Sequence, residues 1–261
     1  MNSNAPVHVQ FGLGPELVVV MSPVMPTWDE GQFFAPLTQS LVDKGYRVVI
    51  FDTLSLLTDD DEPFADFTQR WAGVLEPLGP IALIAGSALG GAVVQGLLAT
   101  AVGRQAAQAL LISSPTRADK ILDRRLGAMA DLASAGDVDT ALMLLDQWVL
   151  PARAKPAARQ PASAASAATA DEQAGRRLNQ GFRLLNELNV EPQVSAWPGR
   201  LLSIFGESSQ LVRATNVSFQ ASAQHLAVGV PGAGMRPLLD DLARVRASVR
   251  SHLGIDLEAH A

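Results

Sequence analysis

Cysteine is absent from this chain of 261 residues, tyrosine occurs once, and only four histidines are present. Without cysteine the chain forms neither a disulfide nor a cysteine-ligated metal site, which is compatible with a reducing cytoplasm. The histidines are scattered, and no two of them stand at metal-ligand spacing: His8, His225, His252 and His260. We therefore expect no metal, no cofactor and a cytoplasmic location.

Positive charge is also scarce. The chain has 20 Lys and Arg against 26 Asp and Glu, a net charge of −6, which argues against a surface that binds nucleic-acid phosphates. The first residues lack the positive charge and the apolar run of a signal peptide. No charged residue occurs between Pro80 and Arg104, but glycines and polar residues interrupt this stretch, which favours a buried strand and helix over a membrane span. We expect neither nucleic acid nor a membrane as a partner.

Short apolar runs alternate with segments of helical periodicity along most of the chain. Strands that alternate with helices at this spacing imply a parallel sheet covered on both faces, within one large domain. The strands are expected at residues 8–11, 16–21, 46–51, 81–85, 109–112, 201–205 and 226–230. Helices are expected at residues 33–44, from the acidic run at 58–63 to about 75, from 89 onward, and at 238–253.

This alternation stops after residue 115. Helical patterns at residues 120–135, 138–150 and 176–188 follow one another without a strand between them. Residues 151–174 are rich in Ala, Pro, Ser and Gln and have too few large apolar groups to offset the entropy of ordering, which predicts a mobile or partly helical linker. The predicted organisation is a core of residues 1–115 and 200–261 with a helical cap of residues 116–199.

Glycines surround the junction between the strand at 81–85 and the helix after it. The sequence Gly86-Ser87-Ala88-Leu89-Gly90 predicts a strand, a sharp turn and a helix, in which only small neighbours fit. It resembles the Gly-x-Ser-x-Gly nucleophile elbow of the α/β-hydrolase superfamily, in particular esterases and thioesterases with a helical lid. The resemblance covers nearly the whole chain and implies the α/β-hydrolase fold, a mostly parallel, doubly wound sheet with a helical cap insertion.

Three positions that carry the catalytic residues in that family hold other residues here. Ala88 stands for the nucleophilic serine, Ser209 for the acid, and Met235 for the histidine. Alanine has no nucleophile, a neutral serine does not stabilise an imidazolium, and methionine does not relay a proton. An engineered Ser→Ala change would explain Ala88 alone, whereas three replacements favour a natural protein that does not use the triad.

Two polar residues nearby leave alternatives open. Ser87 could be a displaced nucleophile, but the second elbow position is expected to direct its side chain beneath the strand as a core serine. Glu207 could face the cleft as a base, or it could be a solvated loop residue or a helix cap. His225 starts the last strand at the opposite end of the sheet, so we expect it at the surface.

The resemblance also implies backbone donors and a pocket. In the family an oxyanion hole uses the N–H after the nucleophile, here Leu89, and an N–H of a nearby loop, here Val24, since Pro23 has none. Arg236 could meet an anionic ligand at the rim or be solvated. The expected ligand-binding residues are Ser22, Met25, Trp28, Ala88, Leu89, Trp148, Glu207, Met235 and Arg236.

Three functions fit this pattern. The preferred one is a triad-free protein that binds a small, largely apolar acyl or carbonyl compound, either as a binding protein or as a non-covalent catalyst of cyclisation or isomerisation in a biosynthetic pathway. The second is a protein-interaction scaffold, which includes a homodimer through the cap. The third is an inactivated esterase or thioesterase. The intact elbow and the three replaced positions favour the first.

Overall fold

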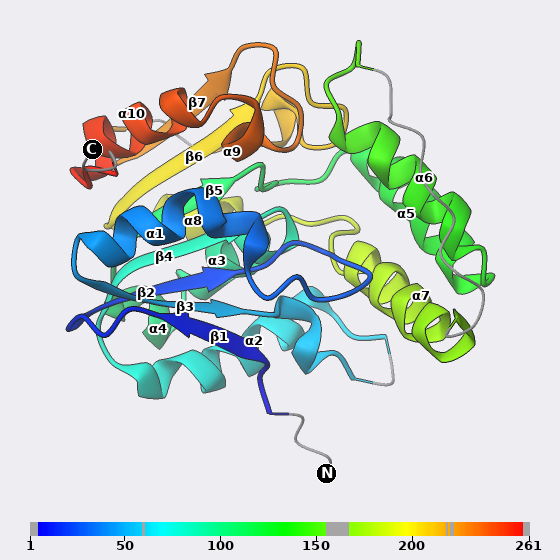
Figure 1. The fold of residues 1–261 in the computed structure, drawn as a ribbon, viewed down its shortest axis with the longest axis horizontal. Coiled ribbons are helices and arrows are strands. Elements are labelled where there is room, and N and C mark those ends of the chain that lie inside the picture. The colour runs from blue at the N-terminus through cyan, green and yellow to red at the C-terminus, as the bar shows by residue number, and fades with distance from the viewer. Residues whose placement is uncertain (1–4, 59–60, 155–166, 218, 220–221, 258–261) are drawn as a thin grey trace.

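The computed structural model of the chain describes residues 5–58, 61–154, 167–217, 219 and 222–257. In this part of the chain seven strands form a single sheet in the order β1-β3-β2-β4-β5-β6-β7 (Figure 1). β1 is antiparallel to β3 and every other neighbouring pair is parallel, which confirms the predicted α/β fold. The strands are β1 (His8–Phe11), β2 (Glu16–Met21), β3 (Tyr46–Phe51), β4 (Ile81–Ser87), β5 (Ala106–Ile112), β6 (Arg200–Gly206) and β7 (His225–Val230).

The central strands are apolar along their whole length because both faces of the sheet are covered. In β2, Val18 and Val20 belong to the hydrophobic cluster under α1 (Ala35–Asp43) and α10 (Leu242–Leu253). Val19 and Met21 point the other way, into the cluster under α2 (Phe64–Leu75) and α3 (Leu89–Leu97). The sheet therefore has a separate core on each face.

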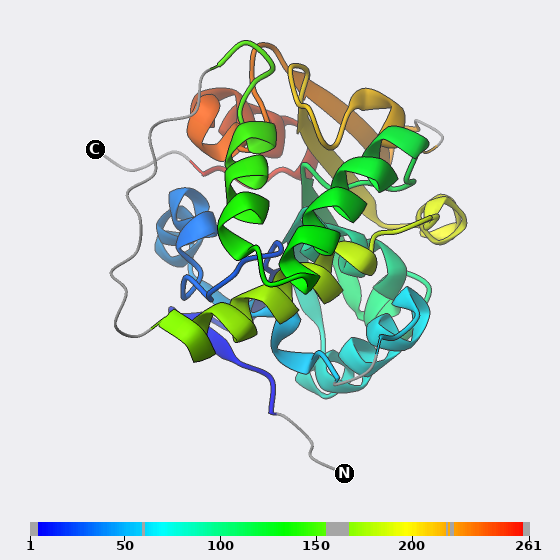
Figure 2. The ribbon, with the colours of Figure 1, turned by 90° about the vertical axis from the view of Figure 1, so that its right-hand side faces the viewer.

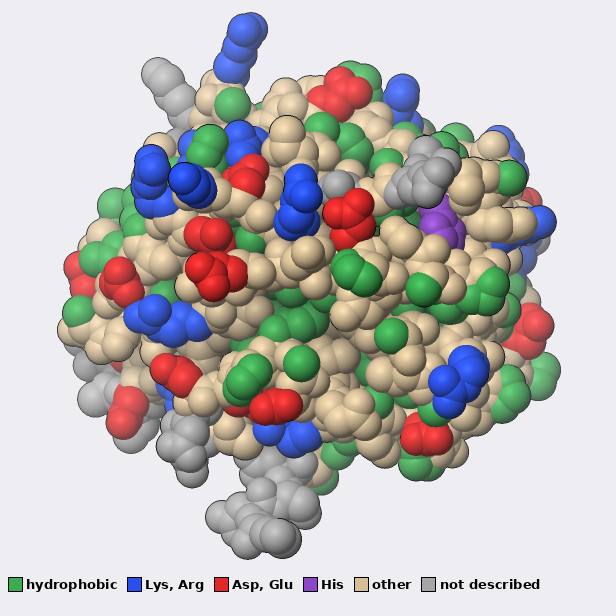
Figure 3. Space-filling model, turned by 180° about the vertical axis from the view of Figure 1, so that it is seen from behind, with side chains coloured by type: hydrophobic (Ala, Val, Ile, Leu, Met, Phe, Trp, Pro, Cys, Tyr) green, Lys and Arg blue, Asp and Glu red, His purple; other side chains and the backbone are tan. Residues whose placement is uncertain are grey.

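Shorter helices connect these elements. They are η1 (Gln32–Phe34), η2 (Thr53–Leu56), η3 (Glu76–Leu78), α4 (Ala101–Gln105), α8 (Glu191–Ala196), η4 (Ala214–Asn216) and α9 (Pro237–Asp240). None of the helices in the described residues combines the length and the apolar character needed to cross a membrane. On the face in Figure 3, Lys and Arg side chains are interspersed with Asp and Glu, so neither sign of charge dominates that face.

Three longer helices lie between β5 and β6 in the sequence: α5 (Lys120–Ser134), α6 (Val138–Val149) and α7 (Ala167–Arg183). We call these three helices the cap, and Figure 2 shows them crossing in front of one end of the sheet. α7 begins at Ala167, within the predicted linker, so residues 167–174 are helical, which is one of the two expected alternatives. Residues 155–166 of the predicted linker lie outside the described part. Alanine favours helix, and Ala174, Leu178 and Phe182 recur every four residues on the buried side of α7.

The carboxyl ends of β2 and β4 face the cap. After β2 the chain leads to α1 on one face of the sheet, and after β4 it leads to α3 on the other face. Neighbouring strands whose connections diverge in this way leave a crevice at their carboxyl ends, where ligands bind in open α/β sheets. The topology therefore places a candidate site between these two loops and the cap.

A buried ion pair joins the cap to the core. Arg177 of α7 donates from its two Nη atoms to the two carboxylate oxygens of Asp52, at 2.8 and 2.9 Å. Its Nε donates to the carbonyl of Met25, at 3.0 Å, in the loop after β2. Asp52 is only 3% exposed and Arg177 only 9%. Because both charges are desolvated, each depends on the other for stabilisation.

Candidate functional site

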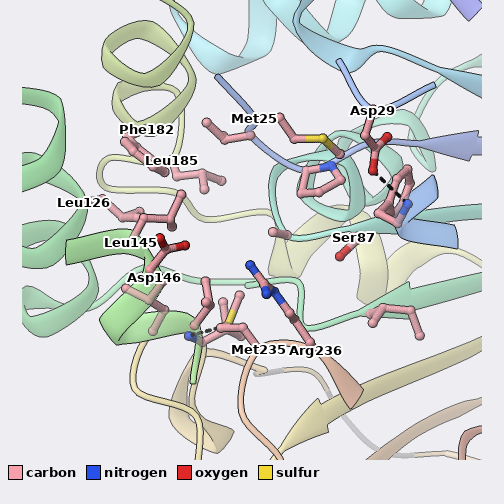
Figure 4. A pocket seen from close by; sticks show the side chains of 18 of the residues that line it. Met25, Asp29, Ser87, Leu126, Leu145, Asp146, Phe182, Leu185, Met235 and Arg236 are labelled. Carbon is pink, nitrogen blue, oxygen red and sulfur yellow. Dashed lines mark hydrogen bonds between the residues drawn. The ribbon is translucent and has the colours of Figure 1, made fainter. Parts of the chain in front are cut away.

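A pocket of about 480 Å³ lies between the cap and the carboxyl ends of β2 and β4 (Figure 4). The loop after β2, the junction of β4 with α3, all three cap helices and the loop after β7 contribute to its wall. Most of the wall is apolar, as in sites that bind small organic molecules. Representative apolar residues in Figure 4 are Met25, Leu126, Leu145, Phe182, Leu185 and Met235.

Ala88 occupies the tip of the turn between β4 and α3 and lines the pocket. Its backbone has φ 47° and ψ −114°, a conformation that side-chain-bearing residues seldom adopt and that costs about 1–3 kcal/mol. Its N–H donates to the carbonyl of Ile112 at 3.0 Å, which ties the turn to β5. A Cβ at Gly86 would lie 2.5 Å from the carbonyl carbon of Gly90, so only glycine allows so sharp a turn.

We expect Ala88→Gly to raise the free energy of unfolding by about 1 kcal/mol. The substitution relieves the positive-φ strain, and this gain exceeds the larger conformational entropy that glycine has in the unfolded chain. Urea unfolding of the two proteins measures the difference. Ala92→Gly, within the following helix, is the control and should lower stability. Destabilisation by Ala88→Gly would show that the turn is not strained.

The two expected backbone donors lie on segments that pack tightly together. Leu89 is the first residue of α3, and its N–H, like that of Val24, has no backbone hydrogen bond to any other part of the described chain. A Cβ at Gly90 would lie 2.2 Å from the carbonyl oxygen of Met21, so the loop after β2 touches the first turn of α3. Val24 lines the pocket. Leu89 is fully buried and does not line it, contrary to expectation, so its backbone N–H lies one residue beyond the lining at Ala88.

Met235 lines the pocket, and two hydrogen bonds hold it in place. Its backbone N–H donates to the carbonyl of Val149 at 2.9 Å, and its Sδ accepts the N–H of Val212 at 3.4 Å. Ser209 is buried outside the lining, and its Oγ has no partner in the described part of the chain.

The pocket wall contains no histidine: His8, His225 and His252, which the structure describes, all lie elsewhere. The described residues also contain no group of three or more His, Asp or Glu that could hold a metal ion.

Ser22 and Trp28 do not line the pocket, contrary to expectation. The Oγ of Ser22 accepts the N–H of Thr53 at 3.0 Å and donates to its Oγ1 at 3.4 Å, so the hydroxyl is used between the ends of β2 and β3. Trp28 instead packs against the hydrophobic cluster under α1. Both side chains belong to the core that supports the loop after β2.

Trp148 and Glu207 also lie outside the wall, contrary to expectation. α6 turns Leu142, Leu145 and Val149 toward the pocket, and 3.6-residue periodicity then places Trp148 on another side, under the guanidinium of Arg125. Glu207 is exposed and lies over the outermost strand: a Cβ at Gly229 would be 2.6 Å from its Oε1. Glu207 is therefore not placed to act as a base in the pocket.

Ser87 lines the pocket, so the expectation that it points beneath the strand is wrong (Figure 4). β4 continues through Ser87, and strand alternation places this side chain on the same face as Leu83 and Ala85. The pocket extends to that face along Asp29 and Phe33. The Oγ of Ser87 has no hydrogen-bond partner among the described residues.

The cap supplies pocket residues that were not singled out from the sequence. They recur at helical spacing, Leu122 and Leu126 on α5, and Leu142, Leu145, Asp146 and Val149 on α6. This spacing is visible in the sequence, but it is equally typical of helices that pack only against a core. The structure distinguishes the two cases because it shows which of these side chains face the pocket rather than a packed core.

No model of a protein family matches the sequence, and no curated protein is significantly similar to it. Solved structures do match. They include an α/β-hydrolase enzyme from a Medee basin deep-sea metagenome library (11% identity, 98% of this chain and 95% of that one, TM-score 0.75) and an esterase from Exiguobacterium antarcticum (12%, 95% and 95%, TM-score 0.71). A third is a serine-to-alanine mutant of the meta-cleavage product hydrolase CumD from Pseudomonas fluorescens IP01, complexed with acetates (11%, 95% and 94%, TM-score 0.64). With its elbow, its parallel sheet and its cap, the chain has the α/β-hydrolase fold.

Proposed function

We propose that this protein binds a small, largely apolar acyl or carbonyl compound in the pocket beside Ala88 and does not hydrolyse it. The observation that supports this most strongly is the elbow itself. Ala88 keeps the strained backbone that presents a residue to the pocket, yet its methyl group has no nucleophilic atom. A strained backbone persists only where its surroundings impose it. The glycine-rich packing around Ala88 therefore maintains the turn, although the nucleophile that such a turn carries in the family is missing.

The other positions support the same proposal. Met235 stands beside the pocket where the family has its histidine, and a thioether does not accept a proton at neutral pH. Ser209 stands for the acid but is a neutral hydroxyl outside the lining. Ser87 is the remaining candidate nucleophile, and no described histidine lines the pocket to activate it. Acyl transfer through a covalent intermediate therefore lacks the histidine base among the described residues of the pocket wall.

Backbone chemistry supports a role that needs no covalent step. The N–H groups of Leu89 and Val24 lie on adjoining segments, and both lack backbone acceptors within the described chain. An apolar wall that excludes water strengthens the polarisation of a carbonyl group by such donors. The bound compound would be held by a binding protein, or oriented for cyclisation or isomerisation by a non-covalent catalyst in a biosynthetic pathway.

An interaction role through the cap has less support. In the described part of the cap, the well-exposed large apolar side chains are Ile121 and Met143, which lie on different helices. Docking surfaces generally offer larger contiguous apolar patches. The pocket, by contrast, gathers apolar side chains from every cap helix. A ligand therefore explains the position of the cap better than a protein partner or a second copy.

We expect Ala88→Ser to have no esterase activity on 4-nitrophenyl butyrate and no covalent labelling by a fluorophosphonate. A serine at this turn would be presented to the pocket, but Met235 would leave it without a base. Absorbance at the nitrophenolate wavelength and intact-protein mass spectrometry measure the two outcomes. Ser87→Ala in the same background reports whether any label is on Ser87. A burst or sustained turnover by Ala88→Ser would favour an inactivated esterase or thioesterase instead.

A further inference from the structure

Three charged side chains line the largely apolar pocket: Asp29, Asp146 and Arg236. The carboxylate of Asp29 accepts the N–H groups of Gly31 and Phe33 at 2.9 and 2.8 Å, which uses both of its oxygens at the start of η1. Asp146 also makes an interaction of its own. The guanidinium of Arg236, by contrast, has neither a hydrogen bond nor an ion pair with any described residue. It is the charged group of the wall that is left for a ligand.

The backbone around Arg236 is fixed. Its carbonyl accepts the N–H groups of Leu239 and Asp240, both at 2.9 Å, and the preceding residue, Met235, is bonded to Val149. Asp240, the acidic residue closest along the chain, accepts the N–H of Gly234 at 2.8 Å and forms no ion pair with Arg236. The arginine is therefore anchored, and its charge is not neutralised by its neighbour.

The guanidinium points into the pocket. In Figure 4 the Arg236 side chain extends from the loop after β7 toward the space enclosed by Met25, Leu185 and Ser87. Arg236 and Leu239 both line the pocket and are both exposed, which places them at its mouth. A planar, weakly hydrated cation at an apolar opening pairs best with a planar oxyanion that accepts two parallel hydrogen bonds.

We infer that Arg236 selects ligands that carry one carboxylate, held at the mouth of the pocket, with the apolar body of the ligand directed inward against the cap helices. This inference rests on the proposed function and specifies its ligand class: an amphipathic carboxylic acid with a second, neutral acyl or carbonyl group. The carboxylate binds Arg236, and the carbonyl group reaches the backbone donors of Leu89 and Val24. Arg236 thus acts as a specificity-determining residue.

The test compares two probes that differ in charge and little in shape, 4-phenylbutyrate and 4-phenylbutyramide. Isothermal titration calorimetry measures their affinities for the wild type, Arg236→Gln and Arg236→Lys. Arg244→Gln is the matched control, because Arg244 is exposed on α10, lies outside the pocket wall and carries the same charge. We expect the wild type to bind the carboxylate about tenfold more tightly than the amide.

In Arg236→Gln the preference should fall to about one through weaker binding of the carboxylate, with the affinity for the amide unchanged. Arg236→Lys should keep part of the preference for the carboxylate, since lysine keeps the positive charge but does not form the bidentate pair of hydrogen bonds that arginine forms. Arg244→Gln should match the wild type. Equal binding of both probes by the wild type and Arg236→Gln would overturn the inference and leave the proposed pocket function standing. Failure of both probes to bind any variant would overturn the proposed function and the inference together.

Discussion

Arg177→Met is expected to lower the free energy of unfolding by about 3–5 kcal/mol. The substitution leaves the Asp52 carboxylate buried at the end of β3 without its partner, and it also removes the hydrogen bond to the Met25 carbonyl. Methionine keeps most of the aliphatic packing of arginine, so the loss reports mainly the uncompensated charge. Urea unfolding followed by tryptophan fluorescence measures it.

Arg183→Met is the matched control on the same helix. Arg183 pairs with Asp131 at 2.8 Å, but the two side chains are 42% and 72% exposed, so this pair is solvent-screened. We expect its removal to cost less than about 1 kcal/mol. If Arg177→Met does not fold, Arg177→Lys, which keeps the charge, gives a smaller loss that can be measured. Equal losses for the Arg177 and Arg183 variants would contradict a buried connection between cap and core.

Gly90→Ala is expected to lower the free energy of unfolding by about 3 kcal/mol. The added Cβ would lie 2.2 Å from the carbonyl oxygen of Met21 and 2.5 Å from that of Ser22. Both obstacles are backbone atoms, so no side-chain rotation relieves the clash. The loop after β2 must move away from α3, which also separates the N–H of Val24 from that of Leu89. Urea unfolding measures the stability change, and calorimetry with methyl 4-phenylbutyrate, whose ester carbonyl would use these two donors, should show weaker binding.

Gly127→Ala is the control for this substitution. Gly127 lies within α5, and a Cβ there meets nothing within 4 Å. Alanine should therefore raise stability by about 0.5–1 kcal/mol, because it favours helix and restricts the unfolded chain. Similar destabilisation at both positions would mean that the close approach at Gly90 is not what makes glycine necessary there.

The sheet could be predicted from the sequence because its signals are local. Runs such as residues 16–21 and 46–51 are apolar and β-branched, and both became strands with the expected bounds. The helix expected at residues 238–253 is divided at Asp241 into α9 and α10. Two further differences between the expected and the observed helices have equally local causes. The short α8 (Glu191–Ala196) contains a proline and is too brief to show periodicity, and the Ala-rich start of α7 has the composition of a linker. Composition alone does not distinguish a helix that packs against the core from an unstructured linker.

The site was harder to predict because its residues meet only in three dimensions. Ala88, Met25, Met235 and Arg236 line the pocket as expected, since each stands at a fixed offset from the end of a strand. The expectation for His225 is wrong: it is only 5% exposed, because a loop brings Phe219 over it and Trp197 stacks beside it with ring centroids 6.2 Å apart. Such packing depends on residues distant in sequence, for which local periodicity gives no signal.

We propose that this pocket binds a carbonyl compound and leaves it intact. Saturation-transfer NMR with methyl 4-phenylbutyrate tests both halves in one sample, because the same spectra report binding and the integrity of the ester. We expect binding to the wild type and to Met143→Trp, an exposed position on α6, and loss of binding in Leu145→Trp, which fills the pocket. The ester should remain uncleaved, as in a protein-free sample. Equal binding by Leu145→Trp, no binding by the wild type, or release of the free acid above the protein-free rate would contradict the claim.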